Sequence, residues 1–295
     1  MFRNLRLRLQ PEKIVVDPAH LSGEWLAENP HLPITLAQLN RLPENTRIRI
    51  LRNLIPPSLL NQFEIDPITW KGSQGSKAVQ IKTEHGTGVI RISVRTTPDS
   101  SGEFFCLEIA DNAYNGIDLN LILLNTLNGE CFGIDYDESG QPTLFGALRR
   151  NLSEEERALR AGLAPGQKRA GLGASRLVLE NLDVFLATLG HRAYFLEPLT
   201  YASAWIFERR GFAYVRGHKL MDDIHKEFQP GGLLNQALDG SNPFRQADQW
   251  RSVRGRAWAI HDGILEVMGT RWDKLRMVKQ VGAHAGVNTF PGSVY

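Results

Sequence analysis

The sequence predicts an α/β fold in which a mostly antiparallel sheet is flanked by helices. Two patterns in the 295-residue chain indicate this fold. Residues 77–137 alternate apolar and polar side chains between short turns, which is typical of antiparallel hairpins. Residues 167–215 read as a glycine loop, a helix, a strand, a second helix and a second strand, which is the order of an α/β unit with a crossover. In such units, ligands bind at loops that follow strand ends.

The antiparallel region supplies the first strands of the expected sheet. Residues 78–82 and 89–94 alternate in polarity on either side of a His-Gly-Thr-Gly turn, which predicts a hairpin. After the strands, Ser153 and Glu156 have the spacing of a capping box, which predicts a helix over 154–161. The further strands are expected at 104–109, 118–124 and 131–135.

The crossover unit begins with the loop at 167–174, whose sequence is Gln-Lys-Arg-Ala-Gly-Leu-Gly-Ala. An aromatic-rich strand is expected within 191–198, and Thr200 is a suitable N-cap for a helix over 201–210. Between the loop and that strand, apolar residues recur at helical spacing up to Gly190, which predicts a helix: Val178, Leu182, Phe185 and Leu189.

The glycine loop is a candidate anion site. A loop of small residues that opens a helix presents unpaired backbone N–H groups at the positive end of the helix dipole. Lys168 and Arg169 add positive charge there, so the order of elements favours a phosphorylated cofactor. The alternative is that the two glycines only let the helix and the strand pack closely.

At these residues the chain resembles the core of the GNAT superfamily of N-acetyltransferases. That superfamily has a pyrophosphate loop of the form Gln/Arg-x-x-Gly-x-Gly/Ala, and the chain is similar at Lys168, Gly171 and Gly173. The family's Tyr-Glu-x-x-Gly-Phe motif resembles residues 207–212, which read Phe-Glu-Arg-Arg-Gly-Phe. The resemblance spans residues 167–215 and implies a mixed, twisted sheet that binds acetyl-coenzyme A where two parallel strands splay. The cofactor-binding residues that it implies are Lys168, Arg169, Gly171, Leu172, Gly173 and Ala174.

The chain departs from the family pattern in three places. Phe207 stands where many members have the tyrosine that reprotonates the leaving thiolate, and phenylalanine has no proton to donate. Thr200 replaces the usual asparagine, and residues 151–168 separate the last upstream strand from the loop by more than the family usually allows. These departures favour cofactor binding over the transfer step.

Three residues are candidates for the proton transfers of such a reaction. Glu197 ends the strand before the second helix and is suited to act as a base, directly or through water, although a structural role at the strand end is the alternative. Tyr201 is the better of two nearby phenols, the other being Tyr194, that could substitute for the missing acid. His261 could accept a proton near neutral pH.

The chain is read as three consecutive regions. Residues 1–75 hold apolar clusters broken by prolines, which predicts short helices around 34–41 and 44–54. The acetyltransferase-like core is expected over 76–217, and residues 218–295 form a C-terminal extension.

The extension contains a segment in which arginines interleave with tryptophans. Arg254, Arg256 and Trp258 are the candidate substrate-binding residues, because guanidinium groups bind carboxylates or phosphates and indoles offer stacking faces. The segment could form a pocket over the cofactor site, contact nucleic acid, or pack its tryptophans and pair its arginines with the chain's own acids. No metal site is expected, since His218 and His225 would need at least one more ligand.

Composition limits the compartment and the partners. With 34 Lys and Arg against 32 Asp and Glu, the net charge of +2 gives no global reason to expect nucleic acid. Cys106 and Cys131 are too few for a disulfide scaffold and favour a reducing compartment. No apolar run approaches the roughly 20 residues that cross a bilayer, and the basic start at 1–6 is not followed by an apolar signal region. We expect a cytoplasmic protein.

These observations combine into one leading functional expectation. The chain would move an acetyl or other acyl group from coenzyme A to the amine of a small molecule or peptide, with no membrane partner. A catalytically silent descendant that binds a ligand or partner through the same cleft is the competing expectation. RNA binding or modification through the Arg/Trp segment is a third, and a homodimer is compatible with the sequence.

Overall fold

The chain forms two compact units, each assembled from segments that are distant in the sequence. The structure is a computed structural model that describes residues 32–96, 102–127, 129–144, 146 and 149–295. Residues 1–31 of the expected N-terminal segment lie outside the described residues. Among the described residues, the first unit comprises those of 32–125 with 172–195 and 280–282, and the second comprises those of 126–171 with 196–279 and 283–295.

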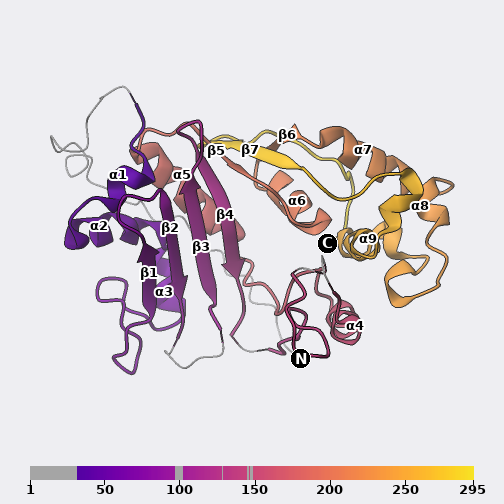
Figure 1. Ribbon diagram of the computed structural model, residues 1–295, viewed down its shortest axis with the longest axis horizontal. Helices are drawn as coiled ribbons and strands as arrows, with labels where there is room; N and C mark the ends of the chain where they lie inside the picture. Colours follow the sequence, from indigo (N-terminus) through magenta and orange to yellow (C-terminus); the bar gives the residue numbers. More distant parts are fainter. Residues whose placement is uncertain (1–31, 97–101, 128, 145, 147–148) are drawn as a thin grey trace. The chain divides into compact units, whose positions relative to one another are not determined.

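The first unit contains strands that follow one another in the order β1-β2-β3-β4-β5 (Figure 1). β1 to β4 pair antiparallel, and apolar residues stand opposite one another, as where Ile92 of β2 faces Ile81 of β1 and Leu107 of β3. The hairpin strands expected from the alternating pattern are therefore confirmed. The bounds are β1 Val79–Thr83, β2 Val89–Val94, β3 Phe105–Asp111, β4 Ile117–Leu124 and β5 Ala193–Leu196.

β5 differs from the other strands of this unit because it runs parallel to its neighbour. Ile117 of β4 pairs with Tyr194 of β5, and Asp118 pairs with Phe195. β4 continues beyond these paired residues to Leu124. Parallel strands need a crossover connection, and α5 lies within the chain between β4 and β5.

The helices of the first unit include the two short ones and the long one expected from the sequence. α3 is not among the helices that the sequence predicts, because prolines, here Pro56 and Pro57, break a helix when they lie in its interior. Pro57 instead occupies the first turn of α3, where a missing N–H has no consequence. The bounds are α1 Leu36–Asn40, α2 Glu44–Leu51, the 3-10 turn η2 Arg52–Leu54, α3 Pro57–Gln62 and α5 Ser175–Thr188.

α5 is held in place by an apolar face and by two buried polar side chains. Figure 1 shows it behind the strands, and the buried face includes Val178, Leu182 and Phe185. The Asn181 side chain donates a hydrogen bond to the carbonyl of Asn53 at 2.6 Å. Asp183 accepts one from the Tyr194 hydroxyl at 2.9 Å. These contacts fix the helix whose first turn follows the glycine loop.

The second unit is mainly helical and contains one antiparallel strand pair. Ala213 of β6 pairs with Val278 of β7, and Tyr214 pairs with Met277. Thr200 caps α6, as expected, through a capping box with Ser203. The bounds are α4 Leu152–Arg160, α6 Tyr201–Glu208, β6 Ala213–Arg216, α7 His218–Glu227, α8 Leu233–Gln236, α9 Val253–His261 and β7 Arg276–Gln280, with 3-10 turns η3 Pro243–Arg245, η4 Gln249–Arg251 and η5 Ile264–Met268.

Glu208, at the end of α6, is a carboxylate in the interior of the second unit. It is fully buried and accepts hydrogen bonds from the hydroxyls of Thr289 and Tyr214, each at 2.6 Å. The backbone N–H of Thr289 adds a third at 3.0 Å. Three donors satisfy a charge that would otherwise be costly to bury.

Two expectations for the second unit are wrong. Residues 131–135 do not form a strand, because Phe132 and Ile134 pack into a core cluster with Ala158 and Trp258 rather than into a sheet. The capping box predicted at Ser153 is also absent. The cap of α4 is Asn151, whose side-chain oxygen accepts a hydrogen bond from the N–H of Glu154.

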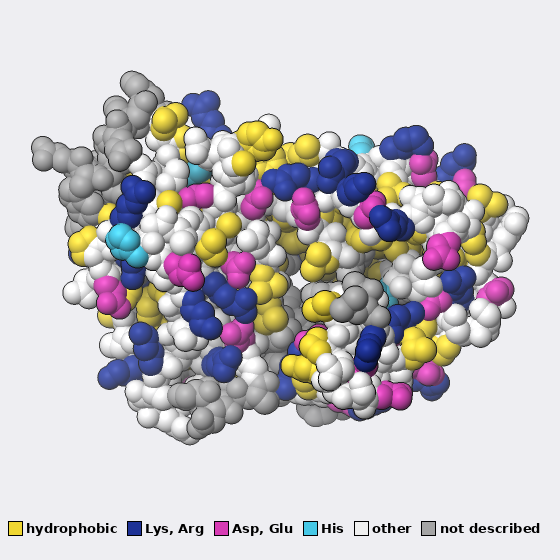
Figure 2. Space-filling view, in the orientation of Figure 1, with side chains coloured by type: hydrophobic (Ala, Val, Ile, Leu, Met, Phe, Trp, Pro, Cys, Tyr) yellow, Lys and Arg dark blue, Asp and Glu magenta, His cyan; other side chains and the backbone are white. Residues whose placement is uncertain are grey.

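The described residues thus form an α/β fold with seven strands, mostly antiparallel, and helices alongside. Of the helices in this part of the chain, none combines the length and the apolarity that crossing a bilayer requires. Basic and acidic side chains lie interspersed on the face shown in Figure 2.

Candidate functional site

The glycine loop leads into α5 without a side chain that caps the helix. The N-cap is Ala174, and no side chain accepts a hydrogen bond from the first turn at that position. Gly171 and Gly173 are both exposed. Gly173 has a φ of +71°, and an added Cβ would meet no atom within 4 Å. The loop therefore has open space in front of backbone groups at the positive end of the helix.

One backbone group of the loop is already occupied. The N–H of Leu172 donates to the carbonyl of Leu124 at 3.0 Å, so this amide is not free to bind a ligand, contrary to the expectation for Leu172. Within the described residues, the N–H groups of Gly173 and Ala174 donate to no backbone carbonyl. Leu124 ends β4, so the bond from Leu172 ties the loop to the carboxyl end of that strand.

The two basic residues of the loop have partners of their own. Lys168 forms an ion pair with Asp135, and both side chains remain partly exposed. The guanidinium of Arg169 donates to the carbonyls of Leu127 and Gly129 at 3.2 and 3.3 Å. Their charges lie beside the loop, but a bound anion would compete with Asp135 for Lys168.

The candidate base Glu197 and the candidate acid Tyr201 have very different surroundings. Glu197 is exposed, and its carboxylate lies 3.3 Å from a guanidinium nitrogen of Arg276. Tyr201 is only 1% exposed, and its hydroxyl makes no hydrogen bond within the described residues. Burial raises the pKa of Tyr201, and the nearby guanidinium of Arg256 opposes this effect. A phenol in this position keeps its proton at neutral pH.

Two of the three candidate substrate-binding residues lie in the interior. Trp258 is fully buried, and its indole N–H donates to the carbonyl of Leu163 at 2.8 Å. Arg256 is also fully buried, between the rings of Phe228 and Phe290. Neither side chain has a surface to offer a substrate, so the expected substrate pocket is wrong for both, because both side chains are buried in the packing of the second unit.

Arg254 and Arg256 also have neighbours that the sequence did not reveal. The guanidinium of Arg254 lies over the ring of Tyr295, 4.4 Å from its centre. A guanidinium nitrogen of Arg256 lies 3.2 Å from Nδ1 of His225. Burial and this nearby positive charge lower the pKa of His225, which is therefore neutral over a wider pH range than a solvent-exposed histidine.

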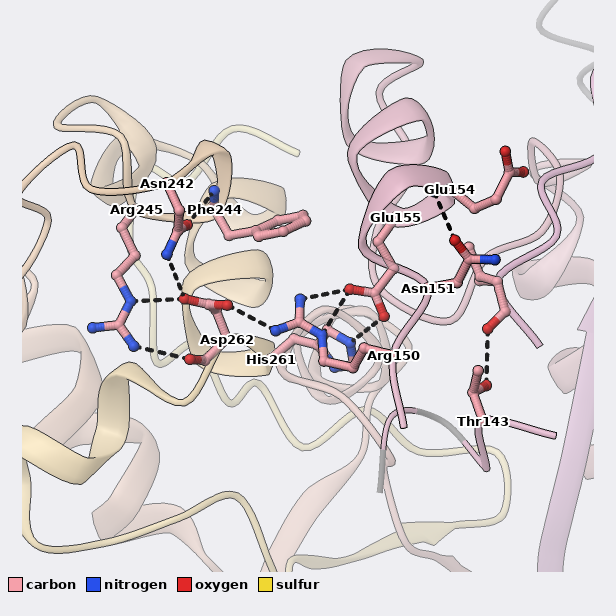
Figure 3. A network of polar contacts seen from close by, with 11 residues as sticks. Thr143, Arg150, Asn151, Glu154, Glu155, Asn242, Phe244, Arg245, His261 and Asp262 are labelled. Atoms are coloured by element: carbon pink, nitrogen blue, oxygen red, sulfur yellow. Dashed lines mark hydrogen bonds and ion pairs between the residues drawn. The ribbon is translucent and has the colours of Figure 1, made fainter. Parts of the chain in front are cut away.

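The third candidate catalytic residue, His261, belongs to a polar cluster that sequence reasoning missed (Figure 3). Its Nε2 lies 3.1 Å from Oε1 of Glu155. Arg150 donates to the other oxygen of Glu155 at 2.9 Å and to Asp262 at 2.7 Å. Arg245 and Asn242 also donate to Asp262, at 2.8 and 3.0 Å. We call this set the His261 cluster.

The carboxylates of the His261 cluster are ionised and held firmly. Burial acts to raise the pKa of Glu155, but hydrogen bonds from His261 and Arg150 outweigh it, so the pKa lies below its usual range. The pKa of Asp262 is also lowered, because hydrogen bonds from Arg150 and Arg245 outweigh the effect of burial. Only 5% of the Glu155 side chain and 12% of the Asp262 side chain are exposed.

A cavity of about 40 Å³ lies beside the His261 cluster. Its lining includes His261, Glu155, Asp135 and Thr200. Leu199 also lines it and is 61% exposed, so the cavity borders the surface. A polar space of this size has room for a water or a small charged head group.

The cluster could not have been found from sequence spacing. Arg150 and Glu155 are five residues apart, but their partner residues lie more than a hundred positions away, at 261 and 262. Comparison with known proteins gives no further guide, since no family model, no curated protein and no solved structure matches the chain.

Proposed function

We propose that this chain is a coenzyme A-dependent N-acyltransferase that moves an acetyl or other acyl group to an amine. The observation that carries the proposal is the uncapped start of α5 at Ala174, preceded by the exposed Gly173 and tied through Leu172 to the carboxyl end of β4. The parallel pairing of β4 with β5 covers two residue pairs while β4 continues to Leu124, which is compatible with strands that diverge. In α/β sheets, ligands bind at the carboxyl ends of such strands.

The residues present suit the diphosphate of coenzyme A. The amides of Gly173 and Ala174 would donate to it, in a place where a bulkier residue than glycine would fill the space. Lys168 and Arg169 would add charge once Lys168 exchanges Asp135 for the ligand. Bound coenzyme A would supply a thioester, whose carbonyl carbon a neutral amine can attack.

Titration of coenzyme A with the purified protein tests the proposed loop site. Replacing Gly173 by leucine puts a side chain into the open space, and we expect the affinity measured by calorimetry to fall at least tenfold. Gly75 provides the matched control, because its φ of +75° is similar and an added Cβ would also meet no atom within 4 Å, but it lies in a different turn. Gly75→Leu carries a similar backbone strain of about 1–2 kcal/mol and should bind normally. Equal affinity in the wild-type protein and Gly173→Leu would refute the loop site.

A binding protein without transferase activity is the second candidate. Phe207 favours it, since its ring lies edge-on to Phe212 and has no proton to give to a leaving thiolate. Thiol release from acetyl-coenzyme A, measured against a panel of primary amines, separates the two candidates. Binding of coenzyme A with no amine-dependent thiol release would favour the silent protein. RNA binding is not proposed, because Arg256 and Trp258 are buried.

A further inference from the structure

We propose that residues 290–295 form a strap that closes over Arg256 and opens when His225 takes up a proton. The strap, Arg256 and His225 all belong to the second unit, so the proposal does not depend on coenzyme A or on the loop before α5. Three features carry it: an arginine buried without a carboxylate, a histidine that accepts from this arginine only while it is neutral, and the surface contacts that hold the strap.

Arg256 is a cation in the interior of the second unit. It is fully buried, and its guanidinium lies between two aromatic rings, 3.5 Å from the ring centre of Phe290 and 5.1 Å from that of Phe228. Its Nε donates to the carbonyl of Trp250 at 2.7 Å. In the part of the chain that the structure describes, Nη2 has no hydrogen-bond partner and no carboxylate pairs with Arg256. A buried charge with so few partners depends on each acceptor that it has.

One of these acceptors is the imidazole of His225. Nη1 of Arg256 lies 3.2 Å from Nδ1 of His225. A guanidinium can only donate, so Nδ1 has to accept with its lone pair. The other ring nitrogen, Nε2, lies 3.3 Å from the side-chain nitrogen of Gln229, which is also a donor. A second proton on the ring would therefore face a donor, and at Nδ1 it would place two cations side by side.

The surroundings of His225 oppose this second proton. Burial and the guanidinium of Arg256 lower the pKa of His225, and Asp222, which also lies on α7, acts in the opposite direction but is outweighed. On α6, Tyr201 lies near Arg256 and is neutral, because burial raises the pKa of its phenol. Glu208, also on α6, already accepts three hydrogen bonds from other groups. The closed form therefore favours neutral His225.

The strap covers the pair of His225 and Arg256 with one ring. Phe290 is 6% exposed, and its ring centre lies 5.4 Å from that of His225. Thr289, just before the strap, is held by its hydrogen bonds to Glu208. Opening beyond this anchor would uncover the pair and leave the contacts of Glu208 in place.

Beyond the ring of Phe290, the strap is held by contacts near the surface. The indole N–H of Trp205 donates to the hydroxyl of Ser293 at 2.9 Å, and the Trp205 ring stacks on Tyr295 with the ring centres 5.5 Å apart. Tyr295, the titratable side chain of the strap, also lies under the guanidinium of Arg254. A short segment held in this way can open locally at a lower free-energy cost than unfolding of the whole unit.

Proton uptake and opening are linked because each favours the other. In the closed form, a protonated His225 would lie 3.2 Å from a guanidinium, under a ring that excludes water, where like charges repel strongly. Water that enters the open form screens this repulsion, so His225 binds its proton more tightly there. The lower pKa belongs to the closed form, so opening should begin as the pH falls below about 6.5. The ratio of open to closed forms should rise by at most about tenfold per pH unit.

Fluorine NMR of protein labelled with 5-fluorotryptophan tests the proposal, because Trp205 contacts the strap. With its signal assigned by Trp205→Phe, we expect a second signal position to appear below about pH 6.5 while far-UV circular dichroism, which follows the overall fold, stays unchanged. His225→Gln cannot titrate, so its Trp205 signal should not change with pH. His218→Gln is the matched control, since His218 also lies on α7 but its side chain is 56% exposed, and it should behave as the wild-type protein does.

Phe290→Leu tests the role of the ring. Leucine covers Arg256 less completely and gives up the ring face, so the Trp205 signal should change at a higher pH than in the wild-type protein. A Trp205 signal that stays constant down to pH 5, that changes with pH in His225→Gln, or that changes at the same pH in Phe290→Leu would overturn the proposal. A change that coincides with loss of the circular dichroism signal would also overturn it, because the whole unit would then be unfolding.

Discussion

The bridge that Arg150 makes between Glu155 and Asp262 allows a prediction of stability and its pH dependence. Arg150→Met keeps an unbranched side chain that can still pack on Phe244, over whose ring the guanidinium lies at 5.0 Å. It removes the hydrogen bonds to both carboxylates. Removing one partner of a buried ion pair costs about 3–5 kcal/mol, and Arg150 is 21% exposed, so we expect about 3 kcal/mol at pH 7.

The sign of the pH dependence follows from the direction of the two pKa shifts. The pKa values of Glu155 and Asp262 are lowered in the folded protein. The two carboxylates therefore stabilise the folded protein at pH values above their pKa of about 4 in the unfolded chain. This stabilisation is lost as the pH falls through their lower pKa values in the folded protein. Without Arg150 this contribution to stability is smaller, so the deficit of the variant should shrink between pH 7 and pH 4 by about 0.8 kcal/mol, which is about RT ln 2 for each of the two carboxylates.

Urea unfolding at both pH values measures the effect of Arg150→Met. Arg160→Met is the matched control, since Arg160 pairs with Glu156 on the same helix α4 but its side chain is 76% exposed. Exposed pairs contribute little, so this control should unfold at the wild-type urea concentration at both pH values. A deficit at pH 7 no larger than that of the control, or one that is the same at pH 4, would show that the His261 cluster does not hold the second unit together.

Three further predictions concern other buried contacts. Trp258→Phe keeps a ring but leaves the carbonyl of Leu163 without its donor, so the free energy of unfolding should fall by about 1–3 kcal/mol in urea. Tyr194→Phe removes the hydroxyl that donates to Asp183 in the first unit, and unfolding followed by far-UV circular dichroism should show a loss of similar size; no loss would mean that the bond is not formed. Burial lowers the pKa of His191, so the unfolded chain binds more protons near pH 6 and the protein should become less stable between pH 7.5 and 5.5. His191→Gln should reduce that slope in calorimetric scans, and an unchanged slope would assign it to other groups.

Local signals in the sequence were sufficient for most elements of the fold. The alternation in 78–82 and 89–94 predicts β1 and β2 because cross-strand pairing needs only neighbouring residues and a short turn. Thr200 predicts the start of α6 because the cap bonds within three residues of itself. The sequence does not predict α3, because a proline disrupts a helix when it lies in the interior but is tolerated in the first turn. Only the structure shows that Pro57 occupies the first turn.

Long-range packing decided the elements and site residues that the sequence did not reveal. Phe132 and Ile134 alternate as in a strand, yet their apolar surface is buried against Ala158 and Trp258. Glu155 looks like one of several acids on the exposed face of α4, and only the fold brings His261 to it. The same holds for Arg256, whose burial between aromatic rings depends on segments at 228 and 290.

The three hydrogen bonds that Glu208 receives have a consequence for truncated forms of the protein. A chain cut after Gly217 would keep Glu208 and β6 but lose Thr289 and β7. The carboxylate would be left with Tyr214 alone, and the edge of β6 would be free to pair with another molecule. Such a fragment should aggregate or be degraded, so we expect the residues after 217 to be required for the folding of the second unit.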